Sequence, residues 1–171
     1  LDLILDHLPA TVLLVFSALT LAVVVGTLLG IIAAQRPNSP FNHAITILAL
    51  SLFSSPVFWT GIIQMLVFAH YIPIFPSYGM STIGIRGSFL TVWADILHHL
   101  VLPALTLSSV YLAVYSRIAR ASMLDVLGSD YIRTARSKGL SRRVVVYKHA
   151  LKNALLPVVT MAGIQFGQLF A

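Results

Sequence analysis

The chain has no cysteine and no glutamate, and only 9% of its 171 residues are charged. Without cysteine it has no disulfide, no thiolate metal site and no thiol nucleophile. A soluble domain carries about 25% charged residues, so this chain cannot cover itself with a surface that suits water. Hydrophobic residues make up 58% of it, and its mean hydropathy is +0.91. The composition therefore predicts a protein whose solvent is lipid.

Four long apolar segments predict membrane-spanning helices. They cover approximately 9–34, 44–69, 97–121 and 151–171. A helix needs roughly 20 residues to cross about 30 Å of hydrocarbon, and its backbone polar groups must be satisfied internally, which excludes isolated strands. We expect an all-α, polytopic transmembrane helix bundle in a single domain, 1–171. Because the chain opens at Leu1 and stops inside the fourth segment, we also expect a fragment of a longer protein.

Lysine and arginine are distributed very unevenly along the chain. Nine of the eleven lie between 117 and 152, and Arg36 lies between the first two spans. Connections on the cytoplasmic side carry an excess of Lys and Arg, and one such residue at mid-bilayer costs about 2.5–3.5 kcal/mol. Both connections are therefore expected to face the cytoplasm. The start of the chain and the loop 71–95 are then expected outside.

Glycines and prolines mark candidate positions of helix packing and bending. Gly26 and Gly30, like Gly163 and Gly167, place small residues on one face of a helix, where another helix can approach closely. The approaching helix would belong to the same chain or, in the alternative, to a second copy. Three prolines lie within or beside spans, and each removes a helix hydrogen bond. They predict kinks that are either static or pivots: Pro56, Pro103 and Pro157.

No acidic or basic side chain lies in the middle of a span, which argues against ion-coupled transport through this chain. Neutral polar side chains occur there instead. Two interpretations stay open, a pathway for a polar, neutral or zwitterionic solute, or hydrogen bonds between helices. The residues are Ser51, Ser54, Ser55, Thr60, Gln64, Thr106, Ser108, Ser109, Tyr111, Thr160, Gln165 and Gln168.

Other kinds of site find little support. His98 and His99, with His70, offer imidazoles, but adjacent helical residues point about 100° apart and no carboxylate triad accompanies them, so we expect no metal site. No glycine-rich phosphate loop is present, so ATP hydrolysis would belong to a partner. The basic segment has only Tyr131 and Tyr147 as aromatics, which disfavours nucleic acid. No nucleophile and base are placed together, so we expect no enzyme activity.

The most charged segment, approximately 123–150, predicts a helix, a glycine corner and a second helix. Ser129 or Asp130 would begin a short helix over 131–138, with Lys138 near its end. Gly139 suits the left-handed residue that follows a helix. Ser141 would begin the next helix, and Leu140 would pack on Val145. Considered by charge alone, the segment could also be a solvated loop that binds anionic lipid.

Two stretches of this segment resemble the cytoplasmic "EAA" loop of ABC-importer permeases. They read DYIRTARSKGL over 130–140 and HALKNALLPVVT over 149–160. The sequence matches the general pattern of that loop, E-A-A-x-x-x-G-x9-I-x-L-P, only poorly, because Arg133, Thr134 and Ala135 stand at E-A-A. The peptide- and nickel-type subgroup is much more similar, and the stretches LPAT before the first span and RASML at 120–124 also resemble it.

The resemblance implies the type I ABC importer permease (MetI-like) fold, of which this chain would hold four spans. It implies a multi-pass protein of the inner (cytoplasmic) membrane. The partners would be a second permease subunit, identical or homologous, cytoplasmic ATPase subunits and an extracytoplasmic solute-binding protein. This chain would bind no cofactor, since ATP and Mg²⁺ would lie on the ATPase. The expected ATPase contact is Tyr131, Arg133, Thr134, Ala135, Arg136, Lys138, Gly139 and Leu140.

The cargo implied by the resemblance is a dipeptide or oligopeptide. Two alternatives stay open. One keeps the ABC importer and changes the cargo to nickel or a metal chelate. The other is a passive helical scaffold or channel whose basic loop binds only lipid. Cargo is selected largely by the separate binding protein, so the sequence does not distinguish peptide, glutathione-like and nickel cargo.

Overall fold

The computed structural model describes residues 2–35, 38–85 and 87–168, which are almost entirely helical and contain no strand. The first part of the chain forms α1 (Asp2–Gln35), α2 (Pro40–Ser54), α3 (Val57–Met65) and, after the π-helix η1 (Leu66–Tyr71), α4 (Phe89–Gly128). The rest forms α5 (Asp130–Ser137), α6 (Arg142–Val144), the π-helix η2 (Val145–Ala150), α7 (Leu151–Ala154) and α8 (Leu156–Gln168). The predicted all-α class is confirmed.

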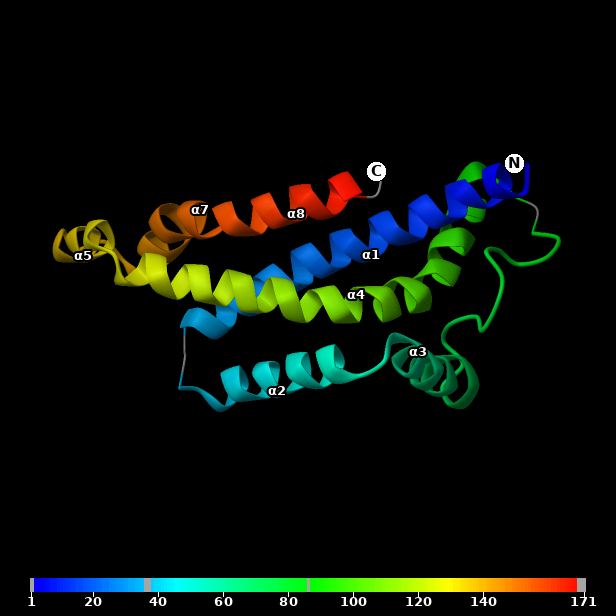
Figure 1. The fold of residues 1–171 in the computed structure, drawn as a ribbon, viewed down its shortest axis with the longest axis horizontal. Coiled ribbons are helices and arrows are strands. Elements are labelled where there is room, and N and C mark those ends of the chain that lie inside the picture. Colours follow the sequence, from blue (N-terminus) through cyan, green and yellow to red (C-terminus); the bar gives the residue numbers. More distant parts are fainter. Residues whose placement is uncertain (1, 36–37, 86, 169–171) are drawn as a thin grey trace.

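The bundle is elongated, with α1, α4 and α8 lengthwise beside one another and α5 at one end (Figure 1). Apolar residues of these three helices form a common core. Ala22 of α1, Tyr115 and Ala119 of α4, and Val158 of α8 are all at most 2% exposed and pack together. The core is thin, and many large apolar side chains face outward, as expected of a protein surrounded by lipid.

Helix α1 packs closely on α4 through two glycines. A Cβ added to Gly26 would lie 2.7 Å from the carbonyl oxygen of Leu112, and one added to Gly30 would lie 2.9 Å from the Cβ of Ala119. Both distances are too short for a real contact, so only glycine permits this crossing. Gly163 and Gly167 of α8 differ, because an added Cβ meets no atom within 4 Å. The first glycine pair therefore packs within the chain, and the second faces open space.

The segment 44–69, predicted as one span, is divided at Ser55 and Pro56. Helix α2 begins at Ser39, whose hydroxyl accepts a hydrogen bond from the Asn42 N–H at 3.2 Å. It ends where Ser55 becomes extended, at φ −85° and ψ 137°, because the proline ring disfavours the helical conformation in the residue before it. The chain then turns by 110° into α3 and η1. The kink expected at Pro56 is thus a full bend.

Two helices of the described residues, α1 and α4, are long and apolar enough to cross a membrane, and there are three spans if the bent α2–α3 pair counts as one. Helix α4 continues through Pro103, and α8 begins one residue before Pro157. The fourth predicted span, 151–171, corresponds to α7 and α8 up to Gln168, with 169–171 outside the described residues. It stays a prediction, as do the roles of the two prolines.

Candidate functional site

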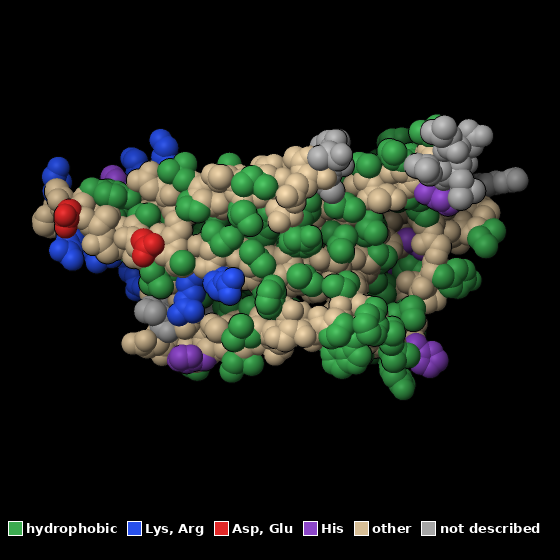
Figure 2. Space-filling model, in the orientation of Figure 1, with side chains coloured by type: hydrophobic (Ala, Val, Ile, Leu, Met, Phe, Trp, Pro, Cys, Tyr) green, Lys and Arg blue, Asp and Glu red, His purple; other side chains and the backbone are tan. Residues whose placement is uncertain are grey.

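The charged segment forms one end of the molecule, where Lys and Arg side chains gather around α5 (Figure 2). Helix α4 stops at Gly128, and Ser129 is extended, at φ −71° and ψ 155°, before α5 starts. The Ser129 hydroxyl donates to the carbonyl of Val126 at 2.6 Å rather than capping α5. Ser129 therefore holds the predicted N-cap position, while its side chain closes the end of the preceding helix.

Gly139 turns the chain after α5. Its φ is +78°, in the left-handed region that favours glycine, and its N–H donates to the Arg136 carbonyl at 3.0 Å. The chain then becomes extended at Ser141, at φ −62° and ψ 149°, and α6 begins. A helix, a glycine corner and a second helix thus occur in the predicted order.

The inner face of α5 packs on the rest of the bundle. Ile132 is fully buried and Ala135 is 7% exposed. They join a cluster drawn from four further elements, α1, α4, η2 and α7, whose other buried members are Ile31, Ala34, Met123, Val145, Val146, Ala150 and Ala154. Burying an isoleucine contributes roughly 1.5–3 kcal/mol. Helix α5 is therefore docked on its own chain rather than extended into solvent.

This packing corrects the expectation for Ala135. The sequence placed Ala135 among the residues expected to contact the ATPase. In the structure the methyl group points into the cluster, so Ala135 sets how closely α5 lies on its own bundle. The reason is helical spacing, since Ile132 and Ala135 are three residues apart and share the apolar face.

The opposite face of α5 is exposed and positively charged. We define the outer face as Tyr131, Arg133, Thr134, Arg136 and Lys138, with Gly139 and Leu140 of the corner, all of which are exposed. Arg133 forms an ion pair at 3.5 Å with Asp130, but both side chains are largely in solvent, so the pair adds little stability. Seven of the eight predicted contact residues are thus exposed, and the eighth, Ala135, is buried.

Two contacts that the sequence did not predict hold the charged end to the bundle. Arg142 donates to the carbonyl of Gln35, the last residue of α1, at 2.6 Å across 107 positions of sequence. This bond satisfies a carbonyl that the helix end leaves without a partner. Asn153 donates to the Tyr131 hydroxyl at 2.9 Å. Both are long-range side-chain contacts, for which the local sequence carries no signal.

A π-helical stretch, η2, also lies outside the predictions. The sequence predicted one helix from Ser141 into the last span, whereas the structure has α6, η2 and α7 in succession. Val145, Val146 and Ala150 of η2 are at most 3% exposed and face the cluster under α5. Widened turns of this kind often occur at functional sites.

Two of the three histidines considered for metal binding, His98 and His99, bond to backbone carbonyls. The Nε2 atom of His98 lies 2.8 Å from the Ile74 carbonyl oxygen, and the Nδ1 atom of His99 lies 2.9 Å from that of Asp95. Within the described residues, no group of three or more His, Cys, Asp or Glu side chains is placed to hold a metal ion. The His98 ring thus fastens the loop after η1 to the start of α4, whereas the His99 ring bonds within α4.

Comparison with known proteins gives a family and several relatives. The family model described as "Binding-protein-dependent transport system inner membrane component" matches residues 26–171. The "Dipeptide transport system permease protein DppB" of Alkalihalophilus pseudofirmus is 39% identical over 178 residues, covering 95% of this chain and 53% of the relative. The "Di/tripeptide transport system permease protein DppB" of Pseudomonas aeruginosa is 40% identical, with the same coverage. The "Oligopeptide transport system permease protein AppB" of Bacillus subtilis is 39% identical, covering 95% and 50%. The chain thus spans about half the length of these relatives.

Proposed function

We propose a role in ATP-driven peptide import for this chain, which belongs to the family of binding-protein-dependent transport system inner membrane components. It would be part of a permease subunit in the inner membrane that forms the path for dipeptides or oligopeptides. The relatives named above are peptide permeases, which supports peptide over nickel cargo. ATP and Mg²⁺ would bind to a separate ATPase, and a solute-binding protein would deliver the cargo.

One observation carries the proposal for coupling, namely that one face of α5 is buried and the opposite face is exposed. Its apolar face is fixed in the bundle by Ile132 and Ala135, and its outer face is free and basic. A helix with this arrangement can accept force from a partner on one side and pass it to the bundle on the other. A passive scaffold that binds only lipid would not require the apolar attachment.

The path of the force follows the contacts of the cluster. Ile132 belongs to the same buried cluster as Met123 near the end of α4 and Ile31 near the end of α1. The bond from Arg142 to Gln35 adds a second attachment to α1. A displacement of α5 would thus reach both long helices at the charged end, where the crossing at Gly26 and Gly30 keeps them together.

Peptide uptake by the complete transporter tests this proposal. Arg136→Glu reverses a charge on the outer face, and Arg143→Glu makes the same change at another exposed arginine outside that face. We expect Arg136→Glu to lower ATP-dependent uptake about tenfold or more while the permease still inserts. A partner surface that receives the basic outer face is acidic, and it repels the new carboxylate. Arg143→Glu should stay close to wild type. Equal uptake by both variants would contradict the coupling role.

A further inference from the structure

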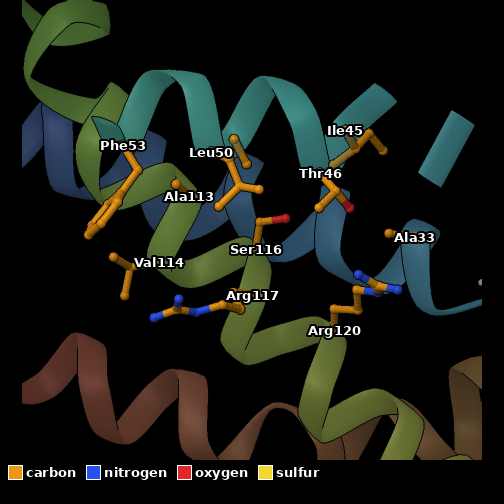
Figure 3. A pocket seen from close by; sticks show the side chains of 11 residues that line it. Ala33, Ile45, Thr46, Leu50, Phe53, Ala113, Val114, Ser116, Arg117 and Arg120 are labelled. Carbon is orange, nitrogen blue, oxygen red and sulfur yellow. The ribbon is translucent and has the colours of Figure 1, made fainter. Parts of the chain in front are cut away.

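A cavity lies between α2 and α4, one turn from the end of α1. Its volume is about 130 Å³, roughly ten times the space that a single water needs. Thr46, Leu50 and Phe53 of α2 line one side, and Arg117 and Arg120 of α4 line the other (Figure 3). Ala49 of α2 also lines the cavity. None of these residues belongs to the outer face of α5.

The two arginines at this cavity have no acidic partner. Neither forms an ion pair within the part of the chain that the structure describes, and the Nε atom of Arg120 is buried without a hydrogen-bond partner there. In Figure 3 the Arg120 side chain extends toward Ala33 of α1, whereas Arg117 extends in the opposite direction. A buried donor without an acceptor costs free energy, and a guanidinium bonds most strongly to an anionic oxygen, so Arg120 favours an anionic ligand at this place.

The rest of the cavity suits hydrocarbon. Its walls are mostly apolar, and a second cavity of about 270 Å³, lined by apolar residues, shares Ile45 and Ala49 with it. Helix α2 is therefore packed loosely on α1 and α4. Leu50 and Phe53, which line the same cavity as the arginines, are 54% and 51% exposed. An occupant that fits both halves carries an anionic group and an apolar chain.

The depth of Arg120 agrees with such an occupant. A Cβ added to Gly30 would lie 3.0 Å from the Arg120 backbone nitrogen, so the two residues are level. Gly30 precedes the last residue of α1, Gln35, by five positions, or about 7–8 Å along the axis. Arg120 thus lies within about 8 Å of the level at which α1 ends, toward the charged end of the molecule.

We propose that this cavity binds an anionic phospholipid of the leaflet at the charged end, with its phosphate on Arg120 and an acyl chain against Ala49 and Phe53. Basic pockets between transmembrane helices are suited to such headgroups. The lipid would complete the loose packing of α2 on α4 and satisfy the buried Nε donor. Arg117 also lines this cavity and adds to its positive potential.

Native mass spectrometry of the full-length transporter complex tests the proposal by titration with phosphatidylglycerol. Arg120→Gln should weaken phosphatidylglycerol binding about tenfold, because charge-assisted hydrogen bonds to the phosphate are lost. Ala49→Phe, which fills the cavity without changing charge, should weaken it as well. Arg143→Gln makes the same change of charge at an exposed arginine elsewhere and should leave binding unchanged.

Several results would overturn the proposal. They are unchanged binding in both cavity variants, an equal loss in Arg143→Gln, or equal affinity for phosphatidylcholine. Competition by glycerol phosphate at the same concentration would assign the site to soluble anions instead. A wild-type complex that binds no phosphatidylglycerol would mean that the rest of the permease fills the cavity. If Arg120→Gln fails to fold, two other variants test the proposal. Ala49→Phe should weaken phosphatidylglycerol binding, and Arg120→Lys, which keeps the charge, should retain it.

Discussion

Gly139 shows at the scale of one residue how backbone conformation constrains the charged end. Its φ of +78° is accessible to glycine at little cost, whereas an L-residue there costs about 1–2 kcal/mol. The position is sterically open, since an added Cβ meets no atom within 4 Å. The cost of a substitution is therefore conformational and not steric. It depends on how well the new residue tolerates the left-handed region.

The first prediction follows from this distinction. Gly139→Val should destabilise the corner and reduce transport, while Gly139→Asn should retain more of both, because asparagine tolerates the left-handed conformation best among residues with a side chain. Hydrogen exchange over 128–150 measures the local opening. If valine and asparagine have equal effects, the constraint at this position is not the backbone.

Ile132 gives a second prediction at the residue scale. Truncating a fully buried isoleucine costs about 2–5 kcal/mol, so Ile132→Ala should loosen α5 from the bundle. Thr134→Ala, on the exposed side of the same helix, should change stability by no more than about 0.5 kcal/mol. Limited proteolysis between 128 and 141 measures how far α5 has detached from the bundle. Comparable resistance of the two variants would mean that α5 is held by something other than its apolar face.

At the scale of elements, the crossing of α1 and α4 depends on Gly26 and Gly30. Gly30→Ala should lower the thermal unfolding temperature of the permease, because its Cβ would collide with α4. Gly163→Ala on α8 is the matched control. There the added methyl meets open space, and alanine is about 1 kcal/mol better than glycine within a helix. A drop for Gly163→Ala equal to that for Gly30→Ala would show that another helix covers α8 in the assembled protein.

The elements also show what sequence reasoning can reach. Residues 131–138 and the glycine corner were predicted from local signals, namely capping residues, charge at the helix ends and a glycine. The burial of Ala135 was missed because the helix was considered apart from α1 and α4. The 110° bend exceeded the kink expected at Pro56, since a proline tells where a helix breaks but not in which direction the chain continues. The bond from Arg142 to Gln35 and the π-helix η2 depend on tertiary packing and leave no local pattern.

At the scale of the whole molecule, charge is concentrated at one end, which predicts its orientation in the membrane. The 171 residues contain no cysteine, so single cysteines can be introduced as reporters. Arg143→Cys should react with an impermeant maleimide only from the cytoplasmic side. Ile83→Cys, in the loop between η1 and α4 and 92% exposed at its native side chain, should react only from outside. Reaction of both from the same side would contradict the predicted orientation.

The account as a whole assigns two faces to α5, one attached to the membrane bundle and one presented to an ATPase. Cross-linking in the assembled transporter tests this assignment most directly. A cysteine at Thr134, on the outer face, should form a short-range cross-link to the ATPase subunit, and its yield should change when ATP binds. A cysteine at Ile83, at the opposite end, should form none. If Thr134→Cys inserts and assembles normally but never cross-links to the ATPase, the outer face of α5 is not the point of coupling.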